Sequence, residues 1–456
     1  MKRSSTRTLA VAAVAALTLG GLSACASTPS ASDINGEQVT ITIGNQPPAT
    51  QEAELAYFNE KLAAFKEQHP NWTIETSESV WDAETFPAQL AGGNLPTVIG
   101  VPFTEMNGLI ARGQVADISQ ALKTTGLSDV LNPSTLTVAQ DAKGQSYGVP
   151  TDAYALGLAY NRELFTKAGL DPDKPPTTWD EVRTDAAAIA AATGQTGFAQ
   201  LTKDNQGGWV LTGQVYSRGG TMENEDGTTV TFDSQQTRDA LQWLHDVRWK
   251  DNSMGSNFLL GAADLAQQFA AGTVGMFVIQ SASYQPVVEV FGMPSSDFGF
   301  TTLPTVDGGD PVTLSGGNVE IVNSTATEAQ KVAALEWVDF YQLQKYRDKD
   351  AAIADAKLKV AQGTAVAIPG PSPVTEEQYQ TYLGWIADLN NVPTANFQPY
   401  LDNAAKQTVL PEPATDSQDL YAALDPVVQA VLTDQNADID ALVTQAASAV
   451  QAKIDR

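Results

Sequence analysis

The sequence predicts an α/β fold in which helices cover a largely parallel sheet. Three features support this prediction: an alternating apolar strand at 39–43, an amphipathic helix at 55–65, and two further strand-like segments at 72–80 and 97–101. A series of strands separated by helices implies parallel strands joined by crossover helices. The chain of 456 residues is also long enough for two or three domains of about 150 residues each.

The first strand is predicted because Val39, Ile41 and Ile43 alternate with polar residues. The segment 44–50, with two consecutive prolines, breaks this strand. The helix that follows has its apolar residues on one face, and His69–Pro70 ends it. Those apolar residues are Leu55, Phe58, Leu62 and Phe65.

Later elements are marked by helix-start signals and by short apolar runs. Thr178–Glu181 and Thr325–Glu328 have the spacing of capping boxes, so we expect a helix to begin at each. Strand-like runs occupy 275–279 and 318–322, and an amphipathic helix is expected at 439–450.

The composition excludes several classes of function. The chain has 53 acidic and 26 basic residues, a formal charge of −27 and no basic stripe, so we expect no nucleic-acid partner. A single Cys cannot form an internal disulfide, and two His leave little for a transition-metal site. We therefore expect no cofactor and no metal.

The N-terminus has the organisation of a lipoprotein signal peptide. Lys2, Arg3 and Arg7 precede an uncharged apolar segment at 9–19, and Leu22-Ser-Ala-Cys25 resembles a bacterial lipobox. We expect residues 1–24 to be removed, Cys25 to carry the lipid that attaches the chain to the membrane, and 25–38 to be a flexible tether. The alternative is that Cys25 is an ordinary residue near a secretory cleavage site.

Several short motifs along the chain resemble one family: the extracytoplasmic solute-binding proteins of ABC importers, in the carbohydrate-binding group that includes maltose-binding protein. They occur in the family's order over essentially the whole chain after residue 39. The motifs are LAGGNLPTVI at 90–99, GVPTD at 148–152, LAYNRELF at 158–165, AGL at 168–170, PPTTWDE at 175–181, FAAGTVGM at 269–276, the pair Gly316–Gly317, and PEP at 411–413.

The resemblance implies two α/β lobes joined by hinge strands, with the ligand held in a cleft between them. We expect 39–155 and 272–325 to form the first lobe, and 156–271 and 326–456 the second. The implied role is that of a monomeric, lipid-anchored receptor on the extracytoplasmic face of the cell membrane. It would capture a mono- or oligosaccharide and deliver it to an ABC permease.

The chain departs from the family pattern at three places. Thr97 stands where Asp is usual, and Gln280-Ser-Ala replaces a frequent aromatic residue, with Tyr284 only nearby. Asn318 replaces a frequent Trp after Gly317. The departures at Gln280 and Asn318 weaken the transfer of sugar-stacking roles to single residues, and they leave the implied fold unchanged.

Candidate ligand-binding residues follow from the chemistry of a sugar, whose faces suit aromatic rings and whose hydroxyls suit carboxylates and amides. Trp209 is a candidate platform, because Gly207 and Gly208 before it favour a loop; the alternative is core packing. We also select Trp81, Asp82, Asp152, Tyr154, Tyr284, Gly317 and Asn318. Trp81 could instead pack on the surface, and Asp152 could instead stabilise a turn.

Two enzymatic functions compete with the binding interpretation. Gly144-Gln-Ser146-Tyr-Gly148 matches the G-x-S-x-G motif of hydrolases, but Pro150 opposes the helix that the motif requires, and His245 lies in a helical apolar pattern. A turn explains the glycines better. A glycosidase needs only two carboxylates, and no pair stands out among 53 acidic residues. We therefore expect a binding protein without catalysis, with a polyol or its phosphate as the alternative ligand.

Overall fold

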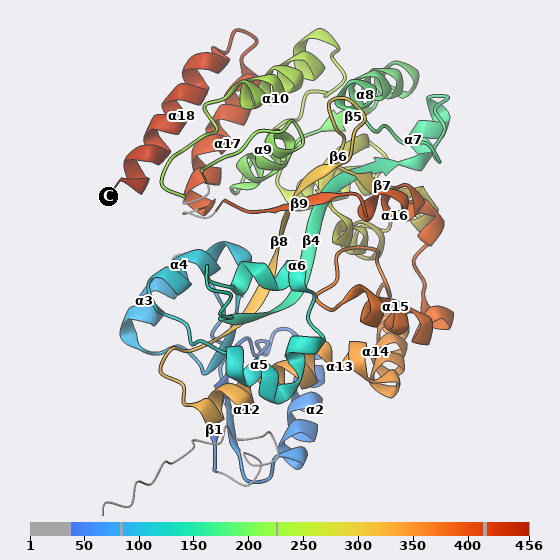
Figure 1. Cartoon of the computed structure of the whole chain (residues 1–456). Helices are drawn as coiled ribbons and strands as arrows, with labels where there is room; N and C mark the ends of the chain where they lie inside the picture. The colour runs from blue at the N-terminus through green and yellow to red at the C-terminus, as the bar shows by residue number, and fades with distance from the viewer. Residues whose placement is uncertain (1–37, 83–84, 225–226, 414–416, 456) are drawn as a thin grey trace, which may run out of the picture.

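The fold consists of two lobes joined by two long strands (Figure 1). The structure is a computed structural model and describes residues 38–82, 85–224, 227–413 and 417–455. Strands β4 (Gly148–Asn161) and β8 (Val312–Val322) run from one lobe into the other. We call the lobe that contains the first strand of the chain the first lobe, and the other the second lobe.

The described strands belong to one sheet path in the order β2-β1-β3-β8-β4-β6-β5, with β7 beside β4 and β9 beside β8. The pairs β1–β2, β1–β3, β5–β6 and β8–β9 are parallel, whereas β4 and β8 run antiparallel to each other. The remaining strands are β1 (Thr40–Ile43), β2 (Thr73–Thr76), β3 (Val98–Pro102), β5 (Thr196–Ala199), β6 (Val274–Gln280), β7 (Phe298–Thr302) and β9 (Thr408–Pro411).

The first lobe packs helices on both faces of β1–β3 and the end of β8. Ile41 and Ile43 of β1 are buried against Phe58 and Phe65, and both rings lie edge-on to Trp337 at 5.7 and 5.2 Å. This packing satisfies the apolar face predicted for the first helix. The helices of this lobe and its flank are α2 (Glu52–Gln68), α3 (Phe86–Gly92), α4 (Met106–Ala111), α5 (Ser119–Thr125), α6 (Pro133–Leu136), α12 (Glu328–Val338), α13 (Gln344–Arg347), α14 (Lys349–Ala361) and α15 (Glu376–Trp385).

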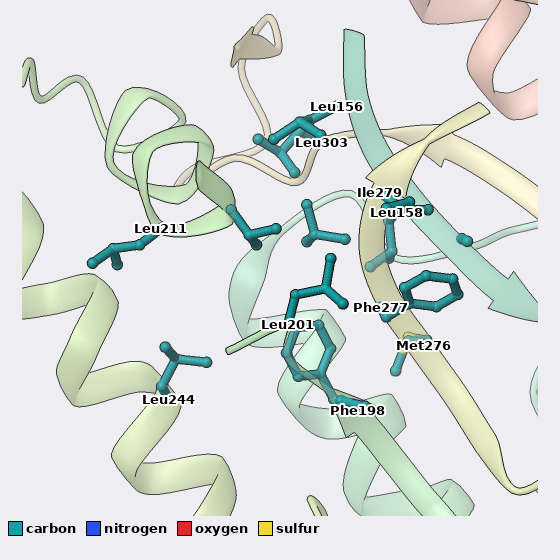
Figure 2. Close-up of a cluster of buried hydrophobic side chains, with 14 of the residues drawn as sticks. Leu156, Leu158, Phe198, Leu201, Leu211, Leu244, Met276, Phe277, Ile279 and Leu303 are labelled. Atoms are coloured by element: carbon teal, nitrogen blue, oxygen red, sulfur yellow. The ribbon is translucent and has the colours of Figure 1, made fainter. Parts of the chain in front are cut away.

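The second lobe has the larger core. Figure 2 shows Leu158 of β4 beside Phe277 and Ile279 of β6, Leu156 beside Leu303, and helical side chains such as Leu211 on the opposite side. Strand β4 is buried at every residue from Ala155 to Asn161, and β6 from Val274 to Ile279, so this strand pair is covered on both faces. The helices of this lobe are α7 (Arg162–Lys167), α8 (Trp179–Thr193), α9 (Gln206–Tyr216), α10 (Gln235–His245), α11 (Ala262–Ala270), α16 (Gln398–Ala404), α17 (Ser417–Thr433) and α18 (Ile439–Ile454).

The strands cross between the lobes at 152–155 of β4 and 315–318 of β8. On one side of this crossing β8 pairs with β3, and on the other β4 pairs with β6 and β7. A third connection follows α15 through 386–397, and the Ala365 N–H donates to the Glu289 carboxylate of the second lobe. The lobes are therefore joined by thin segments, which is the arrangement that permits hinge motion.

The packing departs from the expected lobe boundaries in two segments. Strands β6 and β7, expected in the first lobe, pair with β4 and pack in the core of the second. Helices α12 to α15, expected in the second lobe, lie with the first lobe and its flank, and α12 packs against α2 through Trp337. The chain returns to the first lobe only at β8. The point of return depends on which strands pair with each other. An apolar run in the sequence predicts a strand but does not show which strand it pairs with.

The local signals predicted most elements correctly. Helix α8 begins with the capping box Thr178–Glu181, and α2 ends at Gln68 with His69 as its cap. The capping box expected at Thr325–Glu328 lies further along the chain, where the side chains of Thr327 and Gln330 form it at the start of α12. The signal peptide, Cys25 and nearly all of the tether lie outside the described residues.

Within the part of the chain that the structure describes, no helix has the length and apolar character needed to span a membrane.

Candidate functional site

Two cavities lie on either side of the strand crossing. The upper cavity, in the second lobe, has a volume of about 240 Å³, and the lower cavity, in the first lobe, about 410 Å³. The upper cavity is lined by Tyr154, Asp204, Asn205, Gln206, Trp209, Ala262, Ile279, Gln280, Glu412, Gln418 and Tyr421. The lower cavity is lined by Asn45, Val80, Trp81, Gly100, Pro102, Thr151, Asp152, Asn318, Glu320 and Gln342.

Strand geometry places both cavities on the same face of the crossing. Asp152 and Tyr154 are two residues apart on β4, so their side chains point to the same side. Asp152 is paired with Asn318 and Tyr154 with Gly316. Glu320, two residues beyond Asn318, continues this row into the lower cavity. A ligand at the crossing can thus contact both lobes.

The upper cavity has an aromatic wall. The rings of Tyr154 and Trp209 meet edge to face at 5.8 Å, and both side chains are partly exposed to the cavity. Gly316 makes room for this arrangement, since a Cβ there would lie 2.2 Å from the Tyr154 hydroxyl and 2.7 Å from a Glu412 carboxylate oxygen. The wall offers an apolar ring face next to polar groups, as a sugar platform requires.

Trp209 lies in the first turn of helix α9, not on a loop as expected from the glycines before it. Gly208 is needed for close packing, because a Cβ at this position would lie 2.4 Å from the Tyr421 carbonyl oxygen. The Asp425 carboxylate accepts hydrogen bonds from the N–H groups of Asn205 and Gly208, at 2.9 and 2.8 Å. Helix α17 thereby caps the start of α9 and fixes the position of Trp209.

Glu412 and Gln280 supply hydrogen-bond acceptors in the upper cavity. The Tyr421 hydroxyl donates to Glu412 at 3.2 Å, and burial raises the pKa of Glu412 to about 7. The Gln280 Oε1 atom is buried and has no hydrogen-bond partner in the described part of the chain. An acceptor without a partner is costly inside a protein unless a ligand or water satisfies it.

In the lower cavity, Asp152 and Glu320 differ in their surroundings. Asp152 accepts hydrogen bonds from the backbone N–H and the side-chain amide of Asn318, both at 2.9 Å. The Glu320 side chain has no hydrogen bond or ion pair within the described ranges, and burial together with the Asp152 charge raises its pKa to about 7. Asp152 therefore stabilises the pairing of β4 with β8 at the crossing, while the Glu320 carboxyl is available to a ligand.

The structure brings together five of the selected residues and separates three. Trp81, Asp152 and Asn318 line the lower cavity, and Tyr154 and Trp209 line the upper one. The other three, described next, line neither.

Tyr284 is only 3% exposed and packs against Phe298 and Phe397 in the second-lobe core. Asp82 lies at the start of α3, where it accepts hydrogen bonds from Thr85. Gly317 is buried in β8, where a Cβ would lie 2.4 Å from the Asp152 carbonyl oxygen. Gly317 thus serves the backbone of the crossing.

Sequence reasoning missed Glu320, Glu412, Gln280 and Asn205. Glu320 could have been found from its two-residue spacing to Asn318 on one strand face. Gln280 stands at the position where an aromatic residue was expected, which was itself a signal. Glu412 stands in the PEP motif that supported the family resemblance but was not selected, and Asn205 has no local signal, since both reach the cavity only through the docking of distant segments.

The hydrolase motif does not assemble a triad. Ser146 accepts a hydrogen bond from Gln140 in the first lobe, whereas the His245 ring contacts the Gln435 carbonyl oxygen in the second. Gly144 has a φ of +78°, as a turn requires, and Gly148 begins a strand. The turn interpretation is confirmed.

Comparison with known proteins identifies the family. Residues 49–348 match the family described as bacterial extracellular solute-binding protein. A protein of Brucella abortus named as a binding protein is 29% identical over 208 residues, which are 44% of this chain and 47% of that protein. The chain thus matches about half the length of this relative.

Solved structures share the fold. The cyclic alpha-maltosyl-1,6-maltose binding protein from Arthrobacter globiformis has a TM-score of 0.68 at 21% identity, covering 92% of this chain and 99% of that one. UgpB from Mycobacterium tuberculosis, in complex with glycerophosphocholine, has a TM-score of 0.70 at 19% identity, covering 91% and 98%.

The chain belongs to the bacterial extracellular solute-binding protein family. The resemblance and the two-lobe fold predicted from the sequence are confirmed. Members of this family are solute-binding proteins located outside the cytoplasm.

Proposed function

We propose that this protein is a lipid-anchored receptor that captures a mono- or oligosaccharide and delivers it to an ABC permease, without catalysing a reaction. The observation that carries the proposal is the pairing of the aromatic wall, Tyr154 and Trp209, with acceptors on both sides of the crossing. Those acceptors are Gln280 and Glu412 above and Glu320 below.

The chemistry of the two cavities suits a ligand with many hydroxyls. A sugar ring can place its C–H face on Trp209 while its hydroxyls donate to carboxylate and amide oxygens. The unsatisfied Gln280 Oε1 and the unpartnered Glu320 gain hydrogen bonds when such a ligand binds. Asn45 and Asn205 add amide groups that can both donate and accept.

The same geometry supplies a mechanism for signalling to the permease. A ligand that contacts both cavities interacts more strongly with a closed arrangement of the lobes than with an open one. Binding then shifts the population toward the closed form. We expect the lobes to rotate about the crossing strands, because these strands are thin and lie between two well-packed cores.

A phosphorylated polyol is the alternative ligand, and the structure of UgpB from Mycobacterium tuberculosis makes it worth testing. Among the described residues, no Lys, Arg or His lines the upper or the lower cavity. The cavities instead contain Asp152, Asp204, Glu320 and Glu412. A phosphate in either cavity would meet negative charge without a counter-ion, which favours the uncharged sugar.

Calorimetric titration with a panel of neutral sugars and polyols, using the wild type and Trp209→Ala, tests the proposal. Loss of stacking should weaken binding by about 1–3 kcal/mol. The ligand-free protein should lose less stability than it would from truncation of a fully buried Trp, because Trp209 packs on the core but is partly exposed. Trp385→Ala, a partly exposed Trp on α15 outside both cavities, is the matched control and should leave affinity unchanged. Unchanged affinity in Trp209→Ala with a large loss of stability would overturn the assignment.

A further inference from the structure

A second pair of cavities lies beside the first, between α2 and the segment 340–364. Their volumes are about 210 and 520 Å³, and they share Tyr57, Tyr341, Asp355 and Lys359. We call this pair the side groove. Gln342 lines both the side groove and the lower cavity, so the groove adjoins the candidate ligand site. Helix α14 forms its outer wall.

The side groove is unusual in its charge. Lys61, Lys345 and Lys359 all line its smaller cavity, and all three are partly buried. Lys359 is paired with Asp355 at 2.9 Å, whereas no ion pair involves Lys61 or Lys345 among the residues that the structure describes. Two uncompensated ammonium groups therefore share one cavity in a chain with 53 acidic and 26 basic residues.

Aromatic rings hold these ammonium groups in place. The Lys61 Nζ atom lies 5.6 Å from the ring centre of Tyr57 and 5.5 Å from that of Phe340, and the Lys345 Nζ lies 5.1 Å from that of Tyr346. A cation over a ring keeps its N–H donors free for a further partner. Such a partly desolvated ammonium interacts more strongly with an anion than a fully hydrated one does.

Tyr57 adds a neutral donor to the same cavity. Burial, reinforced by the charge of Asp355, raises the pKa of Tyr57, so its hydroxyl stays protonated at neutral pH. The acidic residues that line the groove are Asp355, which is paired with Lys359, and Glu54, which is exposed at the rim of the larger cavity. The exposed Glu60 lies outside the lining but close enough for its charge to act on Tyr57. The smaller cavity thus presents two free cations and a hydroxyl.

We propose that the side groove is an anion-binding site for the carboxylate or phosphate group of a small acidic solute, such as a sugar acid. Lys61 and Lys345 bind the oxygens of the anion, Tyr57 donates a hydrogen bond, and the rings of Phe340 and Tyr341 contact the body of the solute. This site lies beside the proposed sugar-binding cavities and uses other charged residues, so its existence does not depend on what they bind.

The test uses isothermal titration of the full chain with glucuronate, with inorganic phosphate, and with glucose as the uncharged match. Lys61→Gln combined with Lys345→Gln should weaken binding of both anions about tenfold or more, because each lost contact is a charge-assisted hydrogen bond. Lys123→Gln combined with Lys143→Gln removes the same charge from exposed positions of the first lobe and should leave both affinities unchanged. Tyr57→Phe should produce a smaller loss with the fold intact.

Binding of neither anion to the wild type overturns the inference. So does an equal loss in the two double variants, which would show a general effect of net charge. Glucose binding tests the proposed receptor function alone. It should be weakened by Trp209→Ala and left unchanged by the lysine variants. Failure of either proposal is therefore visible without the other.

Discussion

Replacing Glu412 with Gln should stabilise the protein at neutral and alkaline pH and leave it unchanged near pH 4.5. Glu412 lies in the upper cavity, and burial raises its pKa from 4.5 to about 7. Between these values the folded chain holds a proton that the unfolded chain has released. The free energy of unfolding therefore falls as the pH rises through this window.

The size of the effect follows from the pKa. A rise from 4.5 to about 7 corresponds to about 3 kcal/mol at full strength, at about 1.4 kcal/mol for each pH unit. Because the side chain is partly exposed, screening by solvent reduces this to about 1–2 kcal/mol. Gln keeps the acceptor for the Tyr421 hydroxyl, so the substitution removes the ionisation and little else.

Urea denaturation at pH 4.5 and pH 8, followed by circular dichroism, measures the effect. Glu412→Gln should exceed the wild type by about 1–2 kcal/mol at the higher pH only. Glu67→Gln, at an exposed position near the end of α2, is the control and should follow the wild type at both pH values. A constant offset between Glu412→Gln and the wild type would show that ionisation of the buried carboxyl is not the cause.

Three further predictions concern other parts of the molecule. Gly208→Ala should lower stability by about 1–3 kcal/mol in the same assay, because its Cβ would press α9 away from α17, whereas Gly384→Ala on α15 has open space and should not destabilise. Asp425→Ala leaves the N–H groups of Asn205 and Gly208 without their acceptor, so we expect a loss of about 1–2 kcal/mol and weaker sugar binding through displacement of Trp209, both measurable by melting and calorimetry. Cys25→Ala should give a protein that is secreted or uncleaved, since Cys25 is the single Cys of the chain; recovery of a mature, detergent-phase form after cell fractionation would contradict lipid attachment.

Local sequence patterns determined much of the secondary structure. The alternation of Ile41 and Ile43, the helical spacing of Phe58 and Phe65, and the capping box at Thr178 each produced the expected element. These signals depend on residues within one or two turns of each other, so they need no knowledge of tertiary contacts. The order of short motifs then identified the family.

Only the tertiary structure decided which segments share a lobe and which side chains share a cavity. Helix α12 belongs to the first lobe because Trp337 docks against Phe58, and Glu412 reaches Tyr154 only because β9 pairs with β8. From the sequence, Gly208 predicted a loop. In the structure it lies in α9, where the missing side chain permits close contact with α17. Such contacts join residues far apart in the chain, and short-range periodicity carries no information about them.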